Sequence, residues 1–186
     1  MERSVVFISL FAALIAALGL IPTITLISGV PISAQSLGVM LCGTVLGARR
    51  GALAVLLFLL LVALGLPLLS GGRGGLGVFV GPTVGFLVGF PIAAFVAGII
   101  IERATRWPLM VRAMTGAFVG GVVALYVPGI IGMAVVLGRT FGEATMLALP
   151  FLPGDLAKVV VCGLVTVGLA RARPRSVHTA SAPPAS

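Results

Sequence analysis

Apolar runs close to the length of a membrane-crossing helix recur along this sequence, and they constrain its fold more than any other feature. A helix of about 20 apolar residues spans the hydrocarbon core of a bilayer. The apolar runs cover residues 5–21, 37–48, 51–66, 82–101, 113–137 and 156–170. Only 9% of the residues are charged, against about 25% in soluble domains. We therefore predict an all-α integral membrane protein with six transmembrane helices.

Two parts of this assignment depend on single residues. Arg49 and Arg50 divide the apolar stretch 37–66 into two helices, because charges at the bilayer centre are costly. Pro128 lies inside the fifth run, so we expect tilt or a kink that neighbouring groups satisfy.

The basic residues are unequally divided between the two sides of a six-helix topology. Three lie on one side: Arg73, Arg139 and Lys158. Nine lie on the side of both termini: Arg3, Arg49, Arg50, Arg103, Arg106, Arg112, Arg171, Arg173 and Arg175. Cytoplasmic loops carry such an excess, so both termini are predicted to be cytoplasmic. Because these arginines follow the ends of apolar runs rather than cluster on a polar surface, they argue against nucleic-acid binding.

The first apolar run has a second interpretation. Residues 1–19 could be a cleaved signal peptide, with Arg3 in a basic start and small residues at its end. Five spans would then remain. At the other end, residues 171–186 are rich in Arg, Ser, Ala and Pro and are predicted to be a disordered basic cytoplasmic tail. Residues 1–170 form the transmembrane domain.

Three segments face outward in this topology: 22–36, 67–81 and 138–154. They are long, rich in Gly and Pro, and retain apolar side chains. Long loops in a compact domain are usually functional, so we expect them to roof an outward-facing pocket. The second segment contains a GxGxxG pattern at Gly72, Gly74 and Gly77, but no strand precedes it as a dinucleotide site requires. These glycines instead allow the backbone to approach a ligand closely.

Few groups near the outer side can take part in polar chemistry. They are Gln35, Arg73, Tyr126, Arg139, Glu143, Asp155 and Lys158. Asp155 and Lys158 are three residues apart and therefore share one helix face. They could form a self-neutralising ion pair, or the acid could accept ligand N–H groups while the amine meets an anionic end. Arg73 could bind ligand or reach the outer lipid headgroups.

Catalysis has little support in the sequence. The only histidine, His178, lies in the tail, so a histidine–carboxylate metal site or a histidine base for a serine nucleophile is not expected in the bundle. The sequence has no GxxxxGK[ST] motif, which excludes an ATP-hydrolysing subunit. Cys42 and Cys162 lack metal-ligand spacing and are interpreted as buried packing residues. We predict neither an enzyme nor a metal site.

Four segments together resemble the BioY family, the biotin-binding membrane subunits of energy-coupling factor (ECF) transporters. They are VPISAQSLGVMLCGTVLG (30–47), GLPLLSGGRGGLG (65–77), GPTVGFLVGFPIAAFVAGIIIER (81–103) and PGDLAKVVV (153–161). The similarity runs in order across about residues 12–161. Two departures stand out: Val84, Gly85 and Phe86 occupy positions where the family usually has Gly-Gly-Tyr, and Ser36 replaces the commoner threonine.

The resemblance implies an S-component-like bundle of six helices in a prokaryotic cytoplasmic membrane. It also implies an extracytoplasmic biotin site and assembly with a transmembrane coupling subunit and two cytoplasmic ATPases. Biotin is then the cargo, ATP is used by the partner subunits, and the chain needs no cofactor of its own.

The same resemblance gives roles to particular residues. Asp155 could accept the ureido N–H groups of biotin, and Lys158 or Arg73 could pair with its carboxylate. The implied site is completed by Gly74, Gly75, Gln35, Phe86 and Tyr126. The first helix carries two small-xxx-small pairs, Ala12/Ala16 and Ala13/Ala17, a spacing that permits close helix contact. This face could dock the coupling subunit or pack inside the bundle.

Three other functions remain open at this point. A related subunit could bind another vitamin, because the pocket depends on few polar groups. An intramembrane enzyme is disfavoured by the missing catalytic histidine. A gradient-driven carrier would usually show an inverted repeat with broken helices, and no convincing repeat is found.

Overall fold

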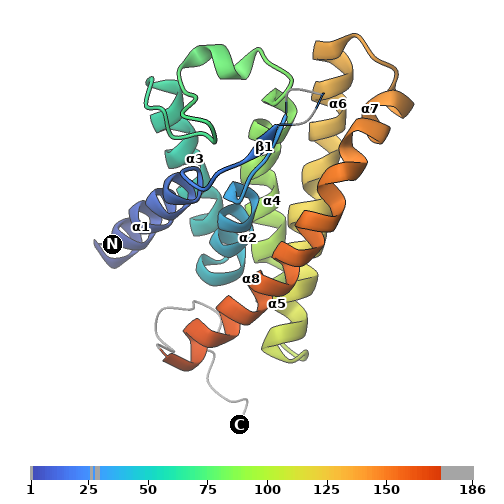
Figure 1. The fold of residues 1–186 in the computed structure, drawn as a ribbon. Helices are drawn as coiled ribbons and strands as arrows, with labels where there is room; N and C mark the ends of the chain where they lie inside the picture. The colour runs from blue at the N-terminus through green and yellow to red at the C-terminus, as the bar shows by residue number, and fades with distance from the viewer. Residues whose placement is uncertain (1, 26, 28–29, 173–186) are drawn as a thin grey trace.

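The chain is a bundle of helices with a small two-stranded hairpin at one end (Figure 1). The computed structural model describes residues 2–25, 27 and 30–172. The α-helices are α1 Glu2–Leu18, α2 Gln35–Leu46, α3 Ala48–Ala63, α4 Val84–Arg103, α5 Leu109–Phe118, α6 Leu125–Leu137, α7 Phe141–Ala148 and α8 Leu152–Ala172. The strands are β1 Ile24–Thr25 and β2 Pro31–Ile32, and the shorter helical turns are η1 Leu76–Phe79, η2 Val119–Ala124 and η3 Leu149–Phe151.

The helices have the apolar character of a membrane protein. In the described part of the chain, three segments are long and apolar enough to cross a bilayer: Val84–Arg103, Leu109–Leu137 and Phe141–Ala172. Two further helices, Ser4–Leu18 and Gln35–Leu46, are apolar but shorter. The prediction of an all-helical membrane bundle is confirmed at this level. The count of six spans and the cytoplasmic side of the termini stay predictions.

Helix α2 lies at the centre of the bundle and is buried along nearly its whole length. It packs against α1, α3, α4, α5 and α8. Close approach to α4 depends on a small residue, because a Cβ at Gly43 would meet the carbonyl oxygen of Ala94 and the side chain of Ala97. Membrane helices associate through such van der Waals contact. α2 is therefore the element against which the others are positioned.

The boundary between α2 and α3 lies at Gly47, close to the break predicted at Arg49 and Arg50, and both arginines belong to the first turn of α3. Gly47 separates the helices and has φ +82°, a backbone conformation that residues other than glycine rarely adopt. Glu102 of α4 accepts a hydrogen bond from the backbone N–H of Ala48 at 2.9 Å. This contact satisfies one of the N–H groups left without a partner at the start of a helix, and Arg49 and Arg50 follow at the end of the bundle.

The expected irregularity near Pro128 is a π-helical turn, η2, inside an otherwise continuous helix from Leu109 to Leu137. The turn ends at Ala124, four residues before the proline. Proline has no N–H to donate to the carbonyl four residues earlier and its ring crowds that carbonyl. Widening of the preceding turn accommodates the proline, as π-bulges do in other helices.

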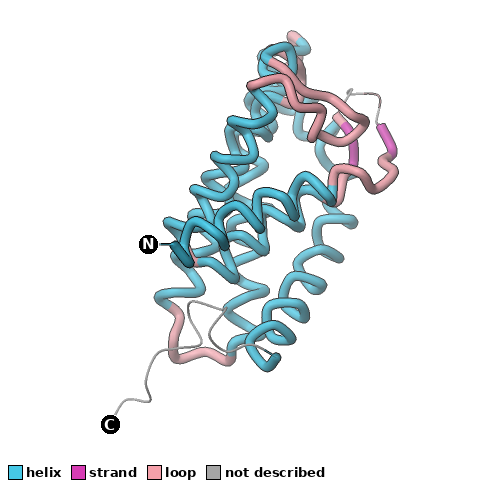
Figure 2. The backbone as a smooth tube through the Cα atoms, turned by 90° about the vertical axis from the view of Figure 1, so that its left-hand side faces the viewer, coloured by secondary structure: helices cyan, strands magenta, loops and turns pink. Residues whose placement is uncertain are grey.

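The three outward segments gather at one end of the molecule, but they are not all loops (Figure 2). The first contains the antiparallel pair β1–β2, with Ile24 opposite Ile32. The second closes through a bridge between Leu69 and Arg73. The expectation of a loop over 138–154 is wrong, because α7 and the start of α8 occupy most of it.

A capping box explains why the third segment is helical. The Thr140 hydroxyl accepts a hydrogen bond from the Glu143 backbone N–H, and the Glu143 carboxylate accepts one from the Thr140 N–H. The Thr-x-x-Glu pattern at these positions is a sequence signature of a helix start. Its presence was the available signal for α7. Glu143 also forms an exposed ion pair with Arg139.

The two cysteines are free and buried, which confirms their interpretation as packing residues. Cys162 belongs to a small polar cluster between α2 and α8. The Thr44 hydroxyl lies 3.0 Å from the Thr166 hydroxyl and 3.3 Å from the Cys162 sulfur. Such hydrogen bonds join neighbouring membrane helices. The predicted disordered tail was to begin at Arg171, but Arg171 and Ala172 are the last residues of α8. The rest of the tail, residues 173–186 with His178, lies outside the described residues.

Candidate functional site

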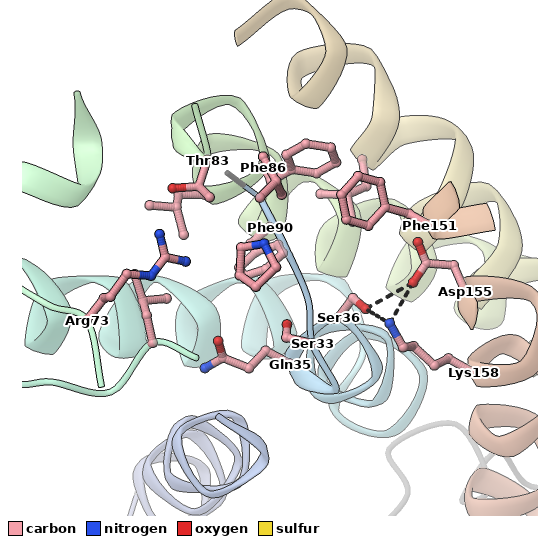
Figure 3. Close-up of a pocket in the computed structure, with 15 residues that line it drawn as sticks. Ser33, Gln35, Ser36, Arg73, Thr83, Phe86, Phe90, Phe151, Asp155 and Lys158 are labelled. Carbon is pink, nitrogen blue, oxygen red and sulfur yellow. Dashed lines mark hydrogen bonds and ion pairs between the residues drawn. The ribbon is translucent and has the colours of Figure 1, made fainter. Parts of the chain in front are cut away.

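A cavity lies beside the hairpin and the 66–83 loop, between the N-terminal ends of α2, α4 and α8 (Figure 3). Its wall is mainly apolar, with Ser36, Asp155 and Lys158 at one end and Arg73 at the other. It is lined by Val30, Pro31, Ser33, Gln35, Ser36, Leu69, Arg73, Thr83, Phe86, Leu87, Phe90, Leu125, Phe151, Asp155 and Lys158. Its volume is about 70 Å³.

Asp155 is the centre of the polar groups at one end of this cavity. It is held in the first turn of α8, where the helix dipole favours a carboxylate. One carboxylate oxygen accepts from Ser36 Oγ at 3.2 Å and from Lys158 Nζ at 2.8 Å. The other accepts from the Tyr126 hydroxyl at 2.8 Å. Three helices, α2, α6 and α8, therefore converge on a single carboxylate.

The predicted Asp155–Lys158 pair is present and largely buried, with side-chain exposures of 7% and 17%. Lys158 also donates to Ser36 Oγ at 2.9 Å. A buried charge without a partner is strongly destabilising, so each residue of this pair is required by the other. The pair is self-neutralising and also forms part of the cavity wall, so both interpretations of its sequence spacing are compatible with the geometry.

The hydrogen-bonding capacity of this pair is not exhausted by its partners among the described residues. A carboxylate offers about four acceptor directions, and the Asp155 carboxylate uses three of them. An ammonium offers three donors, and Lys158 uses two. One acceptor of Asp155 and one donor of Lys158, both residues of the cavity lining, thus have no partner among the described residues. This combination suits a ligand that carries an N–H group and an anionic or carbonyl oxygen.

Gln35 lines the cavity, but its amide is committed to holding the structure together. Its Nε2 donates to the carbonyl oxygens of Ile15 at 3.2 Å and Leu68 at 3.0 Å. Its Oε1 accepts from the backbone N–H of Ser70 at 3.0 Å and from its hydroxyl at 2.9 Å. Gln35 therefore ties α1, α2 and the 66–83 loop together, and positions the loop over the cavity.

The 66–83 loop places Arg73 at the cavity, where the Arg73 Nε donates to the Ser70 carbonyl oxygen at 3.2 Å. Gly74 has no room for a side chain, because a Cβ would meet the carbonyl group of Leu66. Gly75 has φ +80°. Both glycines are therefore required by the fold of the loop itself, and neither is among the lining residues. Their contact with ligand stays a prediction.

Phe86 and Phe151 lie toward the Asp155 end of the cavity, away from Arg73, and Phe90 lies between the two ends (Figure 3). Phe86 lines the cavity and meets Tyr126 edge-on, with ring centroids 6.2 Å apart. It also lies 5.9 Å from the ring of Phe151. Tyr126 is not a lining residue and reaches the site through its hydrogen bond to Asp155. Phe86 thus supplies apolar surface, and Tyr126 orients the carboxylate.

Several lining residues were not predicted as binding residues from the sequence, although Ser36 was noted as a departure from the family pattern. They are Ser33, Ser36, Thr83, Phe90 and Phe151. Ser36 is the most informative, since it contacts both members of the ion pair; its signal was its place directly after Gln35 at the start of an apolar run. Thr83 Oγ1 is buried and has no hydrogen-bond partner among the described residues. A hydroxyl in this state beside a cavity is suited to a ligand.

The four alanines of α1 do not form one accessible face. Ala12 is 3% exposed and belongs to the core, while Ala16 is half-buried. Ala13 and Ala17 are exposed. For Ala12 the structure favours the alternative of packing inside the bundle, because its side chain is covered by neighbouring helices. The structure leaves Ala13 and Ala17 as the accessible small-xxx-small pair.

Nothing in the described site has the composition of a metal centre. No group of three or more His, Cys, Asp or Glu side chains could hold a metal ion in the part of the chain that the structure describes. The arrangement is an apolar slot with polar groups at its ends, which is typical of small-molecule binding sites.

Comparison with known proteins decides the family. The profile of the BioY family matches residues 2–175. The chain belongs to the BioY family. The resemblance seen in the four sequence segments is thus confirmed, and because the family consists of transport proteins, so is the prediction that the chain is not an enzyme.

Individual BioY relatives cover nearly the whole chain. The biotin transporter BioY of Rhodobacter capsulatus is 54% identical over 95% of this chain and 98% of its own length. The biotin transporter BioY of Rhizobium etli is 52% identical, over 88% and 90% of the two chains. The crystal structure of the S-component for biotin from an ECF-type ABC transporter superposes with a TM-score of 0.86 at 26% identity, covering 91% of this chain and 92% of that one. The bundle is therefore that of an ECF S-component.

Proposed function

We propose that this chain is the biotin-binding and uptake subunit of an ECF-type transporter. The observation that carries the proposal is the Asp155 carboxylate, held by Ser36, Tyr126 and Lys158 at one end of a mainly apolar cavity. Biotin has a ureido group with two N–H donors, an apolar thioether ring and chain, and an anionic valerate. The names of the BioY relatives support biotin as the ligand, and no comparable observation favours another vitamin or a gradient-driven carrier.

The open positions on the ion pair suggest how biotin is oriented. The remaining acceptor of Asp155 receives a ureido N–H, and the apolar ring and chain lie against Phe86, Phe90 and Phe151. Arg73, on the far side of the cavity (Figure 3), pairs with the valerate carboxylate. The Thr83 hydroxyl, which is buried without a partner among the described residues, forms a hydrogen bond with the ligand between its ureido group and its carboxylate.

The rest of the proposal concerns the membrane and the partners. Residues 1–172 form the six-helix substrate-binding domain of a prokaryotic cytoplasmic membrane, with both termini in the cytoplasm and residues 173–186 as a tail. A transmembrane coupling subunit docks on the Ala13/Ala17 face, where small side chains allow close helix approach. Two cytoplasmic ATPases use ATP to drive uptake, and this chain requires no cofactor. The match to an S-component of an ECF-type transporter supports this assembly.

The test is ligand binding by the purified, detergent-solubilised protein. We expect biotin to raise its melting temperature in a thermal-shift panel in which thiamine, riboflavin and folate do not. Biotinamide keeps the ureido ring but lacks the carboxylate, so it distinguishes the contribution of the ureido group to binding from that of the carboxylate. It should bind more weakly than biotin to the parent, and Arg73→Gln should remove most of that difference. A protein stabilised by another vitamin and not by biotin would overturn the proposal.

A further inference from the structure

A second pocket lies at the end of the bundle opposite the biotin site, where α2 meets α3 and α4 ends. It has a volume of about 420 Å³. Its lining consists of Leu46, Ala48, Arg49, Arg50, Phe95, Ile99, Glu102 and Arg103. The wall is therefore amphipathic, with an apolar part on α4 and a charged rim from α3 and α4.

The charges of this pocket are not balanced within the protein. Three arginines face one glutamate, which leaves a formal surplus of two positive charges on the lining. Glu102 is already engaged, since its Oε1 accepts from the Ala48 backbone N–H at 2.9 Å. Within residues 2–25, 27 and 30–172, the ion pairs are Arg139–Glu143 and Asp155–Lys158, so the pocket arginines have no carboxylate partner there. The pocket therefore favours an anion.

Helical periodicity extends the pocket along the outside of the bundle. On α3, Arg49 shares a face with Leu53, Leu56 and Leu60, at spacings of four, seven and eleven residues. These three leucines are 51%, 49% and 56% exposed. The basic end of α3 is thus continuous with an uncovered apolar stripe on the same helix face.

Helix α4 repeats this arrangement. Phe95 and Ile99 line the pocket, Arg103 is on its rim, and Ile92 continues the same face as an exposed apolar residue. Two adjacent helices therefore present the same order of groups, arginine at the end and exposed apolar side chains toward the middle. A soluble anion would use only the first of these features, and an acidic protein segment would leave the apolar stripe uncovered.

We propose that this pocket binds the headgroup of an anionic glycerophospholipid, with its acyl chains along the α3 and α4 stripes. The guanidinium groups of Arg49 and Arg103 donate charge-assisted hydrogen bonds to the phosphate, for which arginine geometry is well suited. Basic pockets between transmembrane helices bind anionic lipid headgroups in this way. The site is separate from the biotin cavity and does not depend on which vitamin is carried.

The test is native mass spectrometry of the full chain released from detergent containing equal amounts of phosphatidylglycerol and phosphatidylcholine. The parent should retain phosphatidylglycerol at least fivefold more than phosphatidylcholine. Arg49→Gln/Arg103→Gln should reduce that preference to below twofold. The matched control, Arg106→Gln/Arg171→Gln, removes two exposed arginines outside the pocket and should keep the parental preference.

Further arms of this experiment identify the source of the anion and check the fold. Sodium phosphate at 10 mM should not displace the lipid, because it lacks acyl chains; full displacement would show a soluble-anion site and overturn the lipid assignment. Equal loss of preference in both double variants, or none in either, would also overturn it. A parental melting temperature and a single size-exclusion peak show that the pocket variant is folded, and this check does not depend on the biotin proposal. If that variant does not fold, Phe95→Gln tests the acyl-chain contact and should lower lipid retention at least twofold.

Discussion

Replacing Asp155 by asparagine separates the ligand-binding role of this residue from its structural role. Asparagine keeps the shape of the side chain. Its oxygen can still accept from Ser36 and Lys158, and its NH₂ group can donate to the Tyr126 hydroxyl oxygen. These partners lie 2.8 to 3.2 Å from the carboxylate in the structure, so the internal network can be rebuilt with little movement.

The ligand experiences a larger change. The acceptor that remains open on Asp155 becomes an N–H donor in the asparagine variant, and it then faces a donor on the ureido ring. A hydrogen bond to a charged group contributes about 1.5–3 kcal/mol, and about 1.4 kcal/mol corresponds to a tenfold change in affinity. We therefore expect Asp155→Asn to weaken biotin binding by roughly 10- to 150-fold, measured by isothermal titration calorimetry.

Asp155→Ala is the comparison that exposes the structural role. It leaves Lys158 without a carboxylate at a site where its side chain is 17% exposed, and breaking a buried pair costs about 3–5 kcal/mol. The alanine variant should lose both biotin affinity and thermal stability. The asparagine variant keeps the hydrogen bonds but also leaves the Lys158 charge without a counter-charge, so its melting temperature should fall less than that of the alanine variant. An asparagine variant that binds biotin within threefold of the parent would refute the assignment of Asp155 as a ligand acceptor.

Two further predictions concern the loop and the partner surface. Gly75→Val should weaken biotin binding and lower the melting temperature, because valine is strained at φ +80° by about 1–2 kcal/mol. The control Gly77→Val, where a Cβ meets open space, should behave like the parent. Equal effects of the two variants would show that the backbone conformation of Gly75 is not the reason. The double variant Ala13→Trp/Ala17→Trp should bind biotin with parental affinity in titration calorimetry, since both positions are exposed. It should fail to co-purify with the coupling subunit and ATPases. Normal ATP-dependent uptake by this variant would contradict docking at Ala13 and Ala17. Ala12→Trp should instead reduce the folded yield on size-exclusion chromatography, because this position is 3% exposed, and a well-folded variant would show that the α1 core tolerates the added volume.

Local patterns in the sequence predicted those features that depend on residues close to one another along the chain. Arg49 and Arg50 placed the break between α2 and α3, and the three-residue spacing of Asp155 and Lys158 placed both on one face of α8. The same kind of signal was present but unused for α7, whose Thr140–Glu143 capping box begins a helix where a loop was expected.

Contacts between distant segments could not be obtained in this way. Ser36 meets Asp155 across 119 residues of sequence, and Gln35 uses its whole amide on Ile15, Leu68 and Ser70. Nothing in the residue type shows whether a glutamine near an apolar run will bind a ligand or anchor a loop. That distinction depends on which backbone groups the fold brings within hydrogen-bonding distance.

The sequence by itself determined that this chain enters a membrane, approximately where its helices lie, and which residues share a face within one helix, because these properties follow from composition and helical periodicity. Only the tertiary structure decided how each helix is rotated about its axis. In a soluble protein the polar face marks the outside, but lipid tails are as apolar as the interior of a bundle. Ala12 and Ala13 are chemically identical neighbours, and packing of the whole bundle buries one and exposes the other.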